Sequence, residues 1–176
     1  MENQSNYVAT PKLGFGEAVK KVLNNVTNVK GRARRSEFWW AALAVFIVNF
    51  ILGLFFSAIP TVGTFINVVL SLMMIAVTVR RVQDSNHSAW WVYINFIASI
   101  VMALYMQFSG YMDVLQTVNP NPQDIIGYLA SPLFWLPAAV GTVTGIAIFI
   151  FCLFDSQVGP NKYGDSPKYV SEDNHC

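Results

Sequence analysis

The chain alternates between long apolar runs and short polar segments that hold its charged residues. Four runs of 18 to 22 residues contain no Lys, Arg, Asp, Glu or His: Phe38–Ile59, Val62–Val79, Ala89–Phe108 and Leu133–Phe154. A helix that rises about 1.5 Å per residue needs about 20 residues to cross a hydrocarbon core of about 30 Å. The pattern therefore predicts an all-α integral membrane protein, built as a bundle of four transmembrane helices.

A different pattern precedes the first run. In residues 14–29, apolar side chains recur at helical spacing and polar side chains take most of the other face. This predicts an N-terminal amphipathic helix, which either lies in the lipid headgroup region as an interfacial helix or packs on the ends of the spans. We expect a flexible leader over residues 1–13, a single membrane domain over 14–168 and a tail over 169–176.

The distribution of basic residues predicts the topology. Charged residues make up 12% of the chain, against about 25% in soluble domains. Of the 11 Lys and Arg residues, seven precede the first run, two follow the second run and two follow the fourth run. The turn at Pro60–Thr61 and the long loop over residues 109–132 contain none, and we expect two short helices in that loop, Met112–Val118 and Ile125–Leu129. The positive-inside rule therefore places both termini in the cytoplasm.

Polar residues within the spans are few. Asn49, Asn67 and Asn95 place one amide in each of the first three spans. Such amides hydrogen-bond between helices or line a polar path for a substrate, and both interpretations are open here. Gly141 and Gly145 in the fourth span form a small-xxx-small pattern that allows another helix to approach closely, within the subunit or between subunits.

Three polar motifs adjoin the predicted inner ends of the spans. They are GRARRSEFWW over residues 31–40, RRVQDSNHSAWW over 80–91 and FDSQVGPNKYG over 154–164. We expect them to meet in one cytoplasmic Arg/Trp layer, with Ser36 capping the first span. Tryptophan is enriched at membrane interfaces, so four residues are expected to be interfacial anchors: Trp39, Trp40, Trp90 and Trp91.

The same layer holds the candidate binding residues. They are Arg32, Arg34, Arg35, Glu37, Arg80, Arg81, Asp84 and Asp155. One interpretation is an ionic lattice that fixes how the spans enter the membrane, because the planar guanidinium group pairs well with carboxylates. The other is a site for an anionic lipid headgroup, because the arginines outnumber the carboxylates. A peptide or protein partner is a third.

The three motifs resemble the signatures of the bacterial domain-of-unknown-function 805 family of small inner-membrane proteins. The resemblance covers about residues 14–168, although Gln83 and the pair Asn86–His87 depart from the usual second motif. It implies a compact helical domain whose chain crosses the bacterial cytoplasmic (inner) membrane several times. It implies no established activity, cofactor or catalytic residue.

These features favour a non-enzymatic protein that binds anionic lipid, or an envelope protein, through its Arg/Trp layer. The expected partners are membrane lipids and an envelope protein or a second copy of the chain, not nucleic acid. The alternative is a small homo-oligomeric transporter or flippase that uses the three asparagines. The sequence shows no zinc-binding HExxH motif, no His/Cys cluster and no phosphate-binding Gly-rich loop, so we expect no catalytic residue, metal or cofactor.

Overall fold

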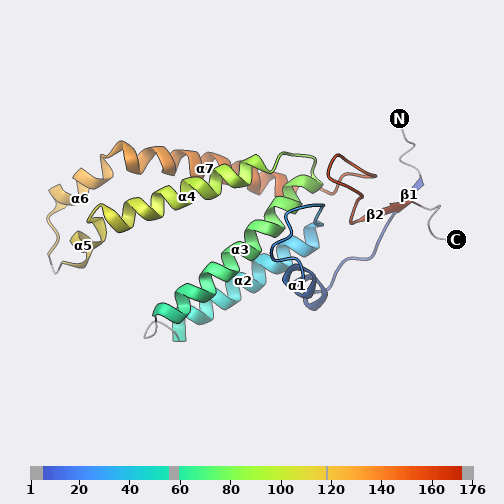
Figure 1. The fold of residues 1–176 in the computed structure, drawn as a ribbon, viewed down its shortest axis with the longest axis horizontal. Helices are drawn as coiled ribbons and strands as arrows, with labels where there is room; N and C mark the ends of the chain where they lie inside the picture. The colour runs from blue at the N-terminus through green and yellow to red at the C-terminus, as the bar shows by residue number, and fades with distance from the viewer. Residues whose placement is uncertain (1–5, 56–59, 118, 172–176) are drawn as a thin grey trace. The chain divides into compact units, whose positions relative to one another are not determined.

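The computed structural model describes residues 6–55, 60–117 and 119–171, and these residues form seven helices and one two-stranded sheet (Figure 1). Four of the helices are long and apolar enough to cross a membrane: α2 (Arg35–Phe55), α3 (Pro60–Asp84), α4 (Trp90–Phe108) and α7 (Pro132–Leu153). The predicted class, an all-α integral membrane protein with four spans, is confirmed. The chain divides into two compact units, residues 1–89 with 150–176 and residues 90–149.

In the first unit, α2 and α3 lie side by side. Helix α2 begins at Arg35, three residues before the predicted start, and the predicted end at residues 56–59 lies outside the described residues. Helix α3 begins at Pro60, where the sequence predicted a turn, because proline suits the first position of a helix. It continues to Asp84, five residues past the predicted end, because its charged last turn is buried among partners.

Helix α1 (Phe15–Leu23) packs on α2 and α3. It buries Ala18 and Val22 completely or almost so, while Phe15 and Leu23 stay 45% and 57% exposed. The predicted helix was longer, and it ends early because asparagine side chains bond to the local backbone: Asn25 Nδ2 donates to the Lys21 carbonyl at 2.8 Å. Of the two predicted placements, packing on the span ends is present in the structure. Insertion among lipid headgroups stays a prediction.

The two ends of the chain meet in a small antiparallel sheet. Strand β1 (Tyr7–Ala9) pairs with β2 (Tyr169–Ser171), and the pairing continues where the Thr10 N–H donates to the Lys168 carbonyl at 2.8 Å. The sequence predicted a flexible leader over residues 1–13, and residues 7–10 of it are paired with the C-terminal segment, while residues 1–5 lie outside the described residues. We call residues 10–13, which run from this sheet towards α1, the strap.

The second unit contains α4, most of α7 and two short helices between them, α5 (Tyr111–Gln116) and α6 (Pro122–Leu129). Short helices were predicted in this loop, although residue 118 lies outside the described residues. Helix α6 begins earlier than predicted because the Asn121 side chain accepts a hydrogen bond from the Gln123 N–H at 3.1 Å, which caps the helix.

Candidate functional site

A buried ionic cluster closes the end of α3. Asp84, the last residue of this helix, is fully buried, as are the side chains of Arg32 and Arg81. Arg32 Nε donates a hydrogen bond of 2.9 Å to Asp84 Oδ1, and Arg81 donates to Oδ2. The Ser156 hydroxyl also donates to Oδ2, at 2.5 Å. One carboxylate thus joins all three sequence motifs and is shared by two cations.

The rest of the Arg32 guanidinium group organises the loop after α7. It donates to the carbonyl groups of Gly159 at 2.7 Å and Gln157 at 2.6 Å. Gly159 has a φ of +74°, a conformation that glycine adopts without strain. A further tie runs from Asn161 Nδ2 to the Gln83 carbonyl at 3.0 Å. The third motif is therefore folded around Arg32 and the end of α3.

A second carboxylate joins the first three helices of the chain. Glu37, in the first turn of α2, is fully buried. Its Oε1 accepts a hydrogen bond from Arg80 of α3 at 2.8 Å, and its Oε2 lies 2.9 Å from Lys21 Nζ of α1. Glu37 thus fixes α1 to the membrane-spanning pair, and Arg80 and Lys21 share this one buried carboxylate.

The remaining two arginines of the first motif do not pair with carboxylates. Arg34 is buried, and it donates to three neutral oxygen atoms of the strap: the Pro11 carbonyl at 2.7 Å, Thr10 Oγ1 at 3.1 Å and the Thr10 carbonyl at 3.4 Å. Arg35 is exposed and makes no hydrogen bond or ion pair with any residue that the structure describes. The predicted lattice therefore holds Arg32, Arg80 and Arg81, while Arg34 and Arg35 form no ion pair with a described carboxylate.

Asp155 pairs with a lysine from the C-terminal segment, not with an arginine. Lys168 Nζ donates to Asp155 Oδ2 at 2.5 Å, and the Ser156 N–H donates to Oδ1 at 2.9 Å. Partial burial raises the pKa of Asp155, but these hydrogen bonds lower it more, so the pKa lies below its ordinary value. Partial burial likewise lowers the pKa of Lys168, and the bond to Asp155 raises it above its ordinary value.

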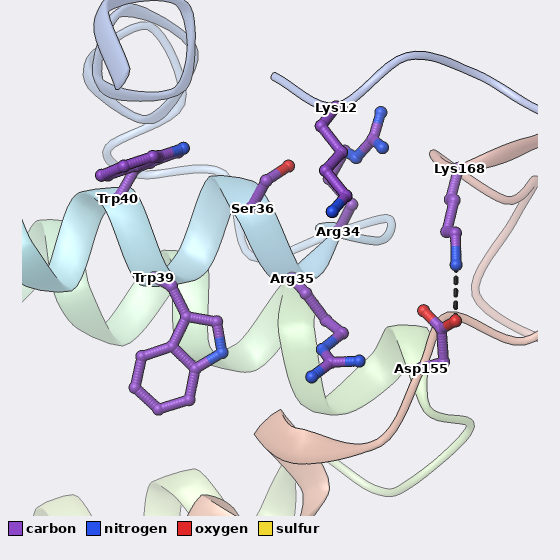
Figure 2. A pocket seen from close by; sticks show the side chains of 8 residues that line it. All are labelled: Lys12, Arg34, Arg35, Ser36, Trp39, Trp40, Asp155 and Lys168. Carbon is purple, nitrogen blue, oxygen red and sulfur yellow. Dashed lines mark hydrogen bonds and ion pairs between the residues drawn. The ribbon is translucent and has the colours of Figure 1, made fainter. Parts of the chain in front are cut away.

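A pocket of about 500 Å³ lies beside the start of α2, next to these groups. Figure 2 shows its side chains, which come from the strap, from Arg34 and the first two turns of α2 that follow it, and from the segments around Asp155 and Lys168. We call it the basic pocket, and its lining residues are Lys12, Arg34, Arg35, Ser36, Trp39, Trp40, Asp155 and Lys168. Four cations therefore line it with one carboxylate, and its chemistry is suited to an anion.

Two of the predicted tryptophan anchors form a wall of this pocket. Trp39 and Trp40 are each 37% exposed. The Trp40 ring packs edge-on against Phe15 of α1, with ring centres 5.7 Å apart, and its Nε1 donates to the Leu13 carbonyl at 3.2 Å. The other two anchors, Trp90 and Trp91, lie in the first turn of α4 in the second unit, where Trp90 is 68% exposed.

Ser36 does not cap α2, contrary to the prediction. The helix begins at Arg35, so Ser36 lies inside its first turn. Its Oγ atom is buried and has no hydrogen-bond partner among the described residues, although the side chain lines the basic pocket (Figure 2). A buried hydroxyl without a partner is unusual in folded proteins, and here it provides an unused donor beside four cations.

The three intramembrane asparagines are divided between the two units. Asn95 Nδ2 donates to the Gly141 carbonyl at 2.8 Å and to Thr144 Oγ1 at 2.9 Å, so it joins α4 to α7 at the small-residue pattern. Asn49 and Asn67 are exposed positions of α2 and α3 in the first unit. The structure thus shows an interhelical role for Asn95.

Lysines complete the site and were not among the predicted residues. Lys21 belongs to the predicted amphipathic helix, Lys12 to the predicted leader, and Lys168 ends the predicted domain. A lysine gives no sequence signal for pairing with a carboxylate far along the chain. Within the described ranges, no group of three or more His, Cys, Asp or Glu residues is placed to hold a metal ion.

Comparison with known proteins identifies the family. The family model described as Protein of unknown function (DUF805) matches residues 26–165, which include all three motifs and both buried carboxylates. The chain belongs to this family. It is 32% identical over 97 residues to the inner membrane protein YhaH of Escherichia coli K12, covering 51% of this chain and 80% of YhaH. The similarity to the inner membrane protein YhaI of the same strain is 29% over 102 residues, covering 51% of this chain and 81% of YhaI.

No solved structure matches the chain. The DUF805 match and the four apolar helices identify an integral membrane protein, and its relatives YhaH and YhaI are inner membrane proteins. The matched range begins at residue 26, so α1 and the strap lie outside it, as does Lys168. The buried ionic clusters are therefore built mainly from the family region, whereas part of the basic pocket comes from segments beyond it.

Proposed function

We propose that this DUF805 protein is a non-enzymatic inner membrane protein that binds the anionic headgroup of a lipid in its basic pocket. The observation that carries the proposal is charge that the fold leaves unbalanced. Arg34, Arg35 and Lys12 line one pocket, and none of them pairs with a carboxylate that the structure describes.

The position of the pocket favours a lipid over a soluble anion. It adjoins the first two turns of α2, a helix long and apolar enough to span a membrane. Trp39 and Trp40 line it, and tryptophan is enriched at the level of the lipid headgroups. A lysine or arginine near an anionic membrane surface contributes about 1 kcal/mol of attraction. The pocket therefore combines charge for a phosphate with aromatic surface for the adjoining glycerol.

The distribution of basic residues along the sequence supports a position of this pocket on the cytoplasmic side of the membrane. A structural role is proposed for the other three arginines, Arg32, Arg80 and Arg81. Each of them pairs with a buried carboxylate, so they hold the segments that form the pocket and do not bind the ligand.

A small homo-oligomeric transporter or flippase was the other candidate, with Asn49, Asn67 and Asn95 along a polar path. The hydrogen bonds from Asn95 to Gly141 and Thr144 favour a packing role for this residue. Flux through proteoliposomes that disappears when the asparagines are replaced, with folding intact, would restore that candidate.

Native mass spectrometry of the detergent-purified protein tests the proposal. Phosphatidylglycerol and phosphatidylethanolamine are added in equal amounts to the parent, to a Lys12→Gln/Arg35→Gln variant and to a Lys20→Gln control. Lys12, Arg35 and Lys20 are all exposed, so none of these changes disturbs the buried clusters. Lys20 lies on α1 and does not line the pocket.

We expect the parent and the control to retain phosphatidylglycerol in preference to phosphatidylethanolamine. The double variant loses two cations and should bind the anionic lipid about 25-fold more weakly, at about 1 kcal/mol for each. Equal retention by all three proteins would refute the proposal. If the parent retains neither lipid, an acidic segment of an envelope protein becomes the better candidate for the pocket.

A further inference from the structure

The net charge of the basic pocket indicates how many negative charges its ligand carries. Lys168 is balanced by Asp155, the one described carboxylate in the lining. Three cations are left over, Lys12, Arg34 and Arg35, and the carboxylate nearest in sequence, Glu37, is already held by Lys21 and Arg80. A phosphodiester with one negative charge would balance one of these three.

The hydrogen-bond donors around the pocket lead to the same conclusion. Arginine bonds phosphate oxygens through two parallel N–H groups, and Arg35 has all of its donors unused by the described residues. The Ser36 hydroxyl is buried without a partner and lines the same pocket. Figure 2 shows the Arg35 side chain pointing from the start of α2 in a different direction from Arg34, while Lys12 comes from the strap, so the cations of the pocket come from more than one segment. Such a site has donors for more phosphate oxygens than a single phosphodiester presents.

We infer that the basic pocket selects a phospholipid whose headgroup carries two negative charges, an inference that rests on the proposed function. Two chemistries meet this requirement: a terminal phosphate monoester, and a headgroup with two phosphodiesters. A volume of about 500 Å³ lies within the range of about 300 to 1,000 Å³ typical of ligand pockets and leaves room for either headgroup.

The strap is part of this selectivity. Lys12 is placed by the strap, which Arg34 holds through the Pro11 carbonyl and Thr10 Oγ1. Arg34 therefore contributes its charge to the pocket and also positions a second cation there. Lys12→Gln and Arg35→Gln remove charge from the pocket while leaving Arg34 and the strap in place.

A competition experiment separates this inference from the proposed function. The purified protein is mixed with phosphatidylglycerol, which has one charge, and with either phosphatidic acid or cardiolipin, which have about two each. Native mass spectrometry at pH 7.5 gives the ratio of bound lipids for the parent, for Arg35→Gln and for the Lys20→Gln control. Thermal unfolding in the same lipids provides a second readout, since a bound ligand raises the melting temperature.

We expect the parent and the control to prefer the doubly charged lipids by about fivefold, the equivalent of about one additional balanced cation. Arg35→Gln should reduce this preference towards one while keeping the melting temperature without lipid. Equal affinity for phosphatidylglycerol and the doubly charged lipids would overturn the inference and leave the proposed function standing. Binding of none of the anionic lipids above phosphatidylethanolamine would overturn both.

Soluble phosphate is tested in the same way. Glycerol 3-phosphate has the phosphate monoester of phosphatidic acid without its acyl chains. We expect it neither to displace the bound lipid at equal concentration nor to match its rise in melting temperature, because Trp39 and Trp40 then lack their lipid contact. An equal effect of glycerol 3-phosphate would overturn the assignment to a lipid.

Discussion

Replacing Asp84 by asparagine would leave the fully buried side chains of Arg32 and Arg81 without the anion that balances them. The amide keeps the shape of the carboxylate but removes its charge, and its NH₂ group would face other donors. Breaking a buried ion pair from one side destabilises proteins by about 3 to 5 kcal/mol. Total stabilities are about 5 to 15 kcal/mol, so Asp84→Asn should remove a large part of the stability of the first unit.

Asp155→Asn is the matched control for this experiment. Asp155 adjoins the same layer, but its side chain is 50% exposed, and exposed ion pairs contribute about 0 to 1 kcal/mol. Both variants are heated in the same detergent, and unfolding is followed by tryptophan fluorescence. In a chain of this length about 1 kcal/mol shifts the melting temperature by about 2 to 4 °C. We expect a fall of about 6 to 20 °C for Asp84→Asn and less than about 4 °C for Asp155→Asn, and equal shifts would refute the central role of the buried cluster.

Three further predictions concern single contacts. Gly159→Ala should destabilise the protein by about 1 to 2 kcal/mol, because its φ of +74° strains any residue with a Cβ atom, whereas Gly16→Ala in the open first turn of α1 should not, as thermal unfolding will show. Asn95→Leu should lose about 0.6 to 2 kcal/mol by removing the bonds from α4 to α7, and unchanged stability in detergent would argue against this contact. Because the pKa of Asp155 is lowered and that of Lys168 is raised, the stability difference between the parent and Asp155→Asn should stay constant from about pH 5 to pH 9. It should be lost as the pH falls below the ordinary carboxyl pKa of 3.8 and the carboxylate is protonated.

The membrane spans could be predicted from the sequence because their signal is local. A run of about 20 uncharged residues is visible without knowing what it contacts. The ends of the helices were predicted less accurately, because a local signal does not show the partners of charged residues. Charges marked the predicted limits at Phe38 and Val79, but Arg35, Arg80 and Arg81 are all helical in the structure. A predicted span ends at its first charged residue, but the helix in the structure continues where that charge has a buried partner.

The different roles of the arginines could not be predicted. Arg32, Arg34 and Arg35 are almost adjacent in the sequence, and residue type alone does not separate them. Their different roles depend on partners from distant segments, Asp84 for the first and the strap for the second. The sheet that positions the strap has three residues in each strand, which is too short for a periodic pattern.

The different roles of Arg34 and Arg35 decide which variants are informative about ligand binding. A change at Arg34 removes a pocket cation and also releases the Pro11 carbonyl and Thr10, so lost lipid binding would not distinguish a missing contact from a displaced strap. Arg35 has no such second task among the described residues, and its side chain is exposed. A loss of lipid from Arg35→Gln at unchanged melting temperature therefore reports on the pocket itself, whereas loss of both from Arg34→Gln reports on the fold that supports it.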